Sequence, residues 1–88
     1  MIKGKTQSGF EFKLEEDVLN DYELLEALRE IDKGDEGAIV DVMNIILSKD
    51  QLRALKEHLR NEKGRVGAIE MISEFSEIMK ASREGKNS

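Results

Sequence analysis

The sequence predicts a small α+β, mostly α-helical domain in which an N-terminal β-hairpin packs on about four helices. Near the N-terminus, apolar residues alternate with polar ones, as they do in a half-buried strand. From residue 15 onward, the apolar spacing changes to the 3.6-residue period of an amphipathic helix. The 88 residues fit one domain over 1–82, followed by a polar and frayed tail over 83–88.

The hairpin is expected over residues 2–14. Phe10, Phe12 and Leu14 alternate with charged residues, so their side chains share one face of a strand. The preceding segment pairs with this strand across residues 7–9, because a Ser-Gly pair favours a tight turn. Two strands alone are marginal in water, so the apolar face of the hairpin must pack on helices.

Four helices are expected, over residues 21–31, 36–47, 49–63 and 66–82, with a further helical turn near 15–19. Their starts are marked by side chains that accept hydrogen bonds from free backbone N–H groups, namely Asn20, Asp35 and Ser48. Ser48 also begins an S-x-x-Q capping box with Gln51. Two glycines, Gly34 and Gly64, are expected to end the first and third helices.

Apolar stripes predict which face of each helix is buried. The first helix carries Val18, Tyr22, Leu25 and Leu28, and the fourth carries Ile69, Ile72, Phe75 and Met79. The second and fourth helices have wider apolar sectors, since Val40, Ile45, Met71 and Ile78 lie beside the main stripes. The second helix is therefore either the most buried one or carries an additional apolar contact.

A wide apolar sector is either plain core or a surface for a partner helix or a second copy of the chain. The pattern alone does not separate these readings. Eight residues form the apolar surface that core and partner would share, and they are the candidate partner-binding residues: Ile39, Val42, Met43, Ile46, Met71, Phe75, Ile78 and Met79.

The net charge of −5 is unevenly distributed along the chain. Residues 15–41 carry eleven acids against Arg29 and Lys33, whereas the flanking segments are each basic by two charges. Such an acidic segment repels nucleic acid and suits solvation or a basic partner. No apolar run approaches the ~20 residues of a membrane span, so a soluble, cytoplasmic protein without membrane contact is expected.

The sequence offers little chemistry for catalysis, and neither an enzyme nor a cofactor is expected. Cysteine is absent, which excludes disulfides and thiolate metal sites. His58 is the one histidine, and no acid or nucleophile is patterned around it. Residues 32–37 lack the ligand spacing of a calcium-binding loop, although the carboxylates of residues 30–36 leave a metal site as one alternative.

A basic stripe on the third helix gives a second alternative. Its members are spaced by three, four and three residues and would share one helix face: Arg53, Lys56, Arg60 and Lys63. Such a face is solvated, contacts a protein, or binds phosphates in a small nucleic-acid-binding regulatory protein. The acidic net charge and the scarcity of aromatic residues argue against nucleic acid.

Four segments, in order, resemble the small tail assembly chaperones of long-tailed (siphovirus-type) bacteriophages and prophages of Gram-positive bacteria. They are Gly4–Phe12 (GKTQSGFEF), Asp21–Leu28 (DYELLEAL), Leu55–Val66 (LKEHLRNEKGRV) and Gly85–Ser88 (GKNS). The resemblance covers nearly the whole chain, and none of the segments is a catalytic motif. In the family a proline often follows Gly-Arg-Val, and Gly67 stands there in this chain.

The resemblance implies a non-enzymatic role. Such a chaperone binds and solubilises the tape-measure protein in the cytoplasm of the bacterial host, and it is absent from the mature virion. A longer form, made by a −1 frameshift near the end of the short form, would contact the tail-tube protein. Gly85-Lys86-Asn87 permits the slippery codons GGA AAA AAC in the gene, which fits such a frameshift. Self-association through the wide apolar sectors is a further expectation.

Overall fold

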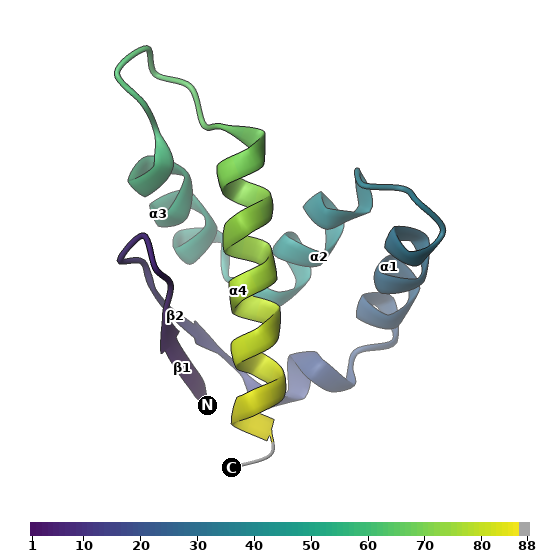
Figure 1. Ribbon diagram of the computed structural model, residues 1–88. Helices are drawn as coiled ribbons and strands as arrows, with labels where there is room; N and C mark the ends of the chain where they lie inside the picture. The colour runs from purple at the N-terminus through teal and green to yellow at the C-terminus, as the bar shows by residue number, and fades with distance from the viewer. Residues whose placement is uncertain (87–88) are drawn as a thin grey trace.

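The computed structural model describes residues 1–86 and has an antiparallel hairpin followed by a short 3-10 helix and four α-helices (Figure 1). The predicted fold class, α+β and mostly α-helical, is confirmed. In chain order the elements are β1 (Ile2–Lys5), β2 (Glu11–Leu14), η1 (Glu16–Asn20), α1 (Tyr22–Asp32), α2 (Ala38–Ile46), α3 (Lys49–Leu59) and α4 (Ala68–Lys86).

The hairpin has the turn that the sequence predicts. β1 pairs with β2 in antiparallel register, with Gly4 opposite Phe12. The backbone N–H of Thr6 donates to the Phe10 carbonyl at 2.9 Å and closes the turn. Gly9 has a φ of +96°, which glycine adopts without the steric cost that other residues incur.

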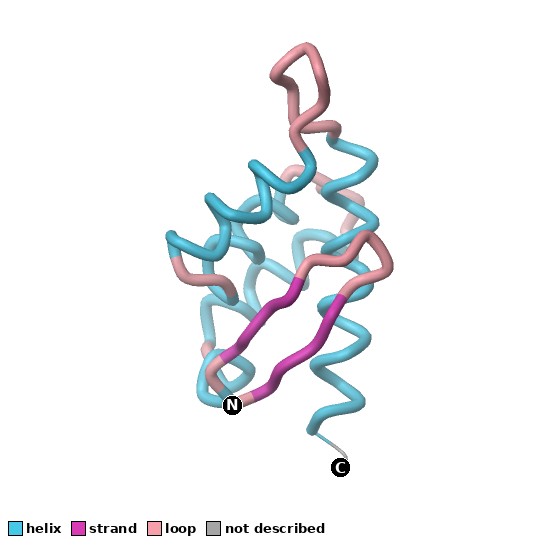
Figure 2. The backbone as a smooth tube through the Cα atoms, turned by 90° about the vertical axis from the view of Figure 1, so that its left-hand side faces the viewer, coloured by secondary structure: helices cyan, strands magenta, loops and turns pink. Residues whose placement is uncertain are grey.

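The hairpin lies between two helices, with β2 beside α3 and β1 beside α4 (Figure 2). The Gln51 side chain of α3 holds β2, since its Oε1 accepts from the Lys13 N–H at 2.7 Å and its Nε2 donates to the Lys13 carbonyl at 2.8 Å. The carboxamide thus satisfies both backbone groups of Lys13, as a neighbouring strand would.

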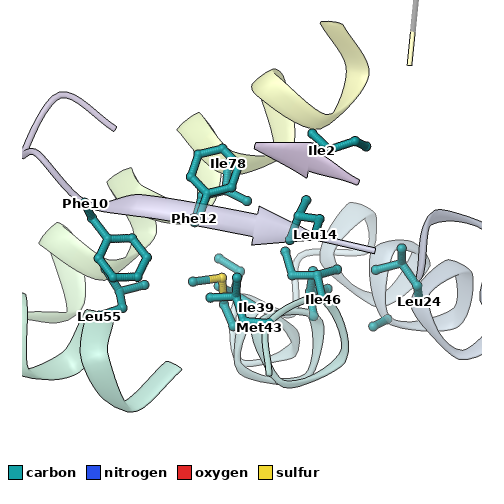
Figure 3. Close-up of a cluster of buried hydrophobic side chains, with 13 residues drawn as sticks. Ile2, Phe10, Phe12, Leu14, Leu24, Ile39, Met43, Ile46, Leu55 and Ile78 are labelled. Atoms are coloured by element: carbon teal, nitrogen blue, oxygen red, sulfur yellow. The ribbon is translucent and has the colours of Figure 1, made fainter. Parts of the chain in front are cut away.

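The hydrophobic core forms where the inner face of the hairpin meets the helices (Figure 3). Phe12 and Leu14 of β2, Val42 of α2, Leu55 of α3 and Ile78 of α4 are each at most 2% exposed. Five of the nine residues of α2 are buried, so α2 is the central helix of the core, in agreement with its wide apolar sector.

The start of α1 differs from the prediction by one residue. Its N-cap is Asp21, whose side chain accepts from the Glu23 N–H at 2.8 Å, whereas the expected cap, Asn20, ends η1. The end is as expected: Gly34 has a φ of +100°, and its N–H donates to the Ile31 carbonyl at 2.9 Å. A left-handed glycine at this position is a common helix stop.

The buried face of α1 is not the predicted stripe. Leu24 and Ala27 are buried, whereas Tyr22 and Leu25 are 72% and 62% exposed. Leu28 is half-buried on the side of the core. α1 carries apolar residues on two faces, one with Leu24 and Ala27 and the other with Tyr22 and Leu25. The small side chain of Ala27 lets α2 approach the first face closely, so the second face stays in solvent.

The caps of α2 and α3 are partly as predicted. The N-cap of α2 is Gly37, and the expected cap Asp35 lies two residues earlier, where its Oδ1 accepts from the Gly37 N–H at 3.0 Å. Ser48 caps α3 as expected, because its Oγ accepts from the Gln51 N–H at 3.2 Å. The side chain of Gln51 does not complete the capping box, since it is bonded to β2.

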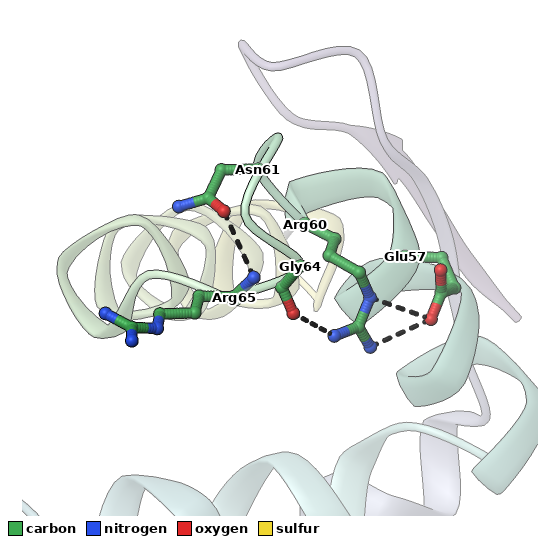
Figure 4. Close-up of polar contacts among 5 residues, drawn as sticks. All are labelled: Glu57, Arg60, Asn61, Gly64 and Arg65. Atoms are coloured by element: carbon green, nitrogen blue, oxygen red, sulfur yellow. Dashed lines mark hydrogen bonds and ion pairs between the residues drawn. The ribbon is translucent and has the colours of Figure 1, made fainter.

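α3 ends at Leu59, so the prediction that it continues to residue 63 is wrong. Asn61 Oδ1 accepts from the Arg65 N–H at 3.1 Å, and Arg60 Nη1 donates to the Gly64 carbonyl at 2.7 Å (Figure 4). These local bonds offer the backbone an alternative to the helical ladder. Gly64, with a φ of +83°, lies within the resulting turn rather than at the helix end.

α4 starts two residues after the expected position and continues beyond the expected end at residue 82. Residues 83–86, which belong to the predicted polar tail, are part of this helix. The rest of that tail, residues 87–88, lies outside the described residues.

The buried face of α4 also differs from its predicted stripe. Glu74, Ile78 and Ser82 are at most 2% exposed, whereas Ile69 and Ile72 are 80% and 37% exposed. These three buried residues recur every four positions, so they lie on one side of the helix. Two of them are polar, and a search for apolar periodicity therefore selects a neighbouring face.

Gly4 allows the ring of Phe12 to lie across β1, because a Cβ added at Gly4 would be 2.5 Å from the Phe12 Cζ. We expect Gly4→Ala to lower the free energy of unfolding by about 1–3 kcal/mol, since the buried ring must move. Urea unfolding measures the loss. The loss should be smaller in a Phe12→Leu background, and an equal loss in both backgrounds would contradict the steric explanation.

Candidate functional site

The eight candidate partner-binding residues divide into two groups in the structure. The four on α2, together with Ile78 of α4, are at most 9% exposed and belong to the core. Met71, Phe75 and Met79 of α4 are half-buried and pack against the margin of that core. In this fold only the second group is in part accessible from outside. The members of the buried group are Ile39, Val42, Met43, Ile46 and Ile78.

Other large apolar side chains are exposed on three helices. They are Tyr22 and Leu25 on α1, Val40 on α2, and Ile69 and Ile72 on α4. The sequence places all but Val40 in buried stripes, so the fold exposes residues that the pattern assigns to the core. Exposed apolar side chains that gather on a surface mark sites of interaction with other proteins.

A groove of about 480 Å³ lies between α1 and α2. Three glutamates of α1, Glu23, Glu26 and Glu30, are spaced by three and four residues and therefore share one face of the helix. The groove also has apolar lining, since Ala27 is buried and Ile45 is half-buried. The complete lining is Glu23, Glu26, Ala27, Glu30, Asp41, Asn44 and Ile45.

A second hollow of about 270 Å³ adjoins the groove on the outer side of α1. Glu26 and Glu30 line both depressions, so they form the ridge between them. Here the exposed Tyr22 and Leu25 contribute apolar surface. Arg29 and Lys33 also line this hollow, and Lys33 Nζ lies 3.6 Å from Glu30 Oε1.

The basic residues predicted to share one helix face do not do so, because α3 ends before Arg60. Arg60 is the C-cap, and it donates from Nε and Nη2 to Glu57 Oε1 at 3.1 and 2.8 Å (Figure 4). Lys63 lies in the following loop. Arg53 Nη1 is 3.8 Å from Asp50 Oδ1. This arrangement presents fewer basic side chains to a phosphate group than a four-residue stripe would. The nucleic-acid-binding alternative stays a prediction.

A polar cluster fastens the hairpin turn to α3 and α4. Glu74 Oε1 accepts from Thr6 Oγ1 at 2.9 Å and from Ser8 Oγ at 2.7 Å. His58 Nε2 lies 3.0 Å from the Ser8 carbonyl oxygen and 3.1 Å from Ser8 Oγ, so one ring nitrogen faces both polar groups of Ser8. The carboxylate of Glu74 is 2% exposed, and these hydroxyl donors compensate part of its loss of solvation.

The cluster contains a serine, a histidine and a glutamate, but its hydrogen bonds differ from those of a hydrolytic triad. In a triad the carboxylate binds the imidazole, and the imidazole accepts the serine proton. Here the Glu74 carboxylate accepts from the Ser8 hydroxyl at 2.7 Å instead of orienting the imidazole, and His58 Nε2 is shared between Ser8 Oγ at 3.1 Å and the Ser8 carbonyl at 3.0 Å. The geometry therefore supports a structural clamp. Sequence reasoning did not single out Glu74, although its position four residues before Ile78 was an available signal.

Within residues 1–86, no group of three or more histidine, aspartate or glutamate side chains is arranged to hold a metal ion. In the same range, no helix combines the length and the apolar character needed to cross a membrane. Comparisons with protein-family models, curated proteins and solved structures find no match to this chain. What the surface binds therefore has to be inferred from its own residues.

Glu74→Ala should destabilise the fold, because it leaves the hydroxyls of Thr6 and Ser8 without their acceptor. We expect a loss of about 1–3 kcal/mol in the free energy of unfolding, measured by urea titration. Glu70→Ala, at an exposed position one turn before Glu74 on the same helix, is the matched control and should change stability by less than about 0.5 kcal/mol. Similar losses for both variants would contradict a clamp at Glu74.

Proposed function

We propose that this chain is a non-enzymatic tail assembly chaperone of a long-tailed bacteriophage or prophage. It binds the tape-measure protein in the cytoplasm of the bacterial host and keeps that long chain dispersed until the tail tube assembles around it. The protein then leaves the complex and is absent from the mature virion. The proposal is supported by the resemblance of four segments to this family and by the exposed apolar surface.

The observation that carries the proposal is the exposure of large apolar side chains on a domain whose core is already filled. Leu25 and Ile69, for example, are 62% and 80% exposed on α1 and α4. Covering such side chains with a partner contributes about 25 cal/mol per Å² of apolar area removed from water. Each contact is weak, but many copies bound along one long partner would together hold it in solution.

The charge of the chain suits the same role. A net charge of −5 on 88 residues opposes aggregation of the complexes through mutual repulsion. The acidic residues concentrate on η1, α1 and the groove beside α2, next to the exposed apolar side chains of α1. A bound apolar segment would thus be bordered by charge that stays in solvent.

A longer form that contacts the tail-tube protein is a second part of the proposal. It would arise by a −1 frameshift at the codons of Gly85–Asn87. Sequencing the gene across codons 85–88 and the frame beyond tests this part. A slippery heptamer followed by an open −1 frame of domain length would support it, and a closed −1 frame would remove the longer form.

Co-expression with apolar fragments of the neighbouring tape-measure protein tests the chaperone role. We expect the wild-type chain to keep such fragments in the soluble fraction and to co-purify with them. The double variant L25E/I69E should keep its own fold, because both side chains are exposed. It should lose the fragment, because charge replaces the apolar contact.

The control for this experiment is K56E, which changes an exposed residue of α3 away from the apolar side chains. It should retain the fragment as the wild-type chain does. If the fragments stay insoluble at every ratio of wild-type chain to fragment, the chaperone function is wrong. If L25E/I69E retains the fragment, the exposed apolar residues are not the contact.

A further inference from the structure

The outer surface of α1 is a helix face without a partner in the fold. Tyr22 and Leu25 stand exposed on it, and the two adjoining depressions extend it toward α2. We call this surface, made by the two depressions and their ridge of Glu26 and Glu30, the α1 surface. It combines apolar side chains with a concave shape, which are the features of a helix-binding groove.

The charges on the α1 surface indicate what kind of helix fits it. The groove between α1 and α2 is lined by four carboxylates and by no basic side chain, whereas the outer hollow is lined by Glu26 and Glu30 and by two basic residues, Arg29 and Lys33. Glu23 and Glu30 are seven residues apart, which is about 10 Å along the helix axis, or two turns. An occupant helix lying along α1 would therefore meet a negative charge at each turn.

We propose that the α1 surface binds an amphipathic helix that carries lysine or arginine every three or four residues beside an apolar stripe. The apolar stripe covers Tyr22 and Leu25, and the basic residues lie over Glu23, Glu26 and Glu30. The inference rests on the proposed function only in assigning this helix to the tape-measure protein.

The two kinds of contact have different roles. Removal of the apolar side chains from water supplies most of the affinity. Exposed ion pairs are individually weak and are screened by salt, so they select the partner and its orientation. An apolar helix bordered by acidic residues would place like charges against the three glutamates and would be rejected.

Two synthetic helices test this pairing with the intact chain. One has a leucine stripe flanked by lysines at three- and four-residue spacing, and the other has glutamate in place of every lysine. Fluorescence anisotropy of labelled peptides measures binding. We expect the basic helix to bind the wild-type chain at least about tenfold more tightly than the acidic helix, with a smaller ratio at high salt.

Charge reversal on the protein gives the decisive comparison. The variant E23K/E26K/E30K should bind the basic helix about 10- to 100-fold more weakly than the wild-type chain and should now prefer the acidic helix. The matched control D17K/E36K/E62K changes exposed acids outside both depressions. It shifts the net charge equally, from −5 to +1, and should keep the wild-type preference.

Several outcomes would overturn the proposal. Equal binding of both helices, or of neither, would show that the carboxylates do not select the occupant. If both triple variants change the preference for the basic helix equally, that preference follows from the net charge of the protein. If sedimentation shows that E23K/E26K/E30K alters self-association and leaves peptide binding unchanged, the surface contacts a second copy. If that variant still solubilises tape-measure fragments, the assignment of the bound helix to the tape-measure protein is wrong and the chaperone function stands.

Discussion

Two strands that pair only with each other leave one apolar face to bury, and the helices of this chain are arranged around that requirement. Phe12 and Leu14 of β2 are almost fully buried, and they are covered by helices that follow much later in the chain. The side chain of Gln51 then occupies the edge of β2, and α4 lies beside β1. The helices thus pack over and beside a two-stranded sheet that would not be stable in water by itself.

The hairpin turn is held differently from the strands. Thr6 and Ser8 donate to the buried carboxylate of Glu74, and the His58 ring lies beside Ser8 and Phe10. A buried carboxylate is retained in a fold when its hydrogen bonds compensate its desolvation. This polar contact joins residues 68 positions apart, so it also fixes which face of α4 turns toward the core.

The fold uses amphipathic helices that have more apolar surface than one core can cover. α1 turns Leu24 and Ala27 inward and leaves Tyr22 and Leu25 in solvent, and α4 does the same with Ile69 and Ile72. The uncovered residues on α1 line a hollow that adjoins an acidic groove. Exposed apolar side chains with charges beside them suit the proposed chaperone role, in which the chain would bind apolar segments without aggregating itself.

The local features could be predicted from the sequence: the hairpin and its Gly9 turn, the existence of the helices, the Ser48 cap and the Gly34 stop. These depend on residues close together in the chain, whose propensities and hydrogen bonds act locally. The division of the apolar residues into core and surface could not be predicted, because it depends on how the helices pack. On a helix with two apolar faces, local spacing is equally compatible with burial of either face. The choice depends on distant partners, such as Ala27 against α2 and Glu74 against the hairpin turn.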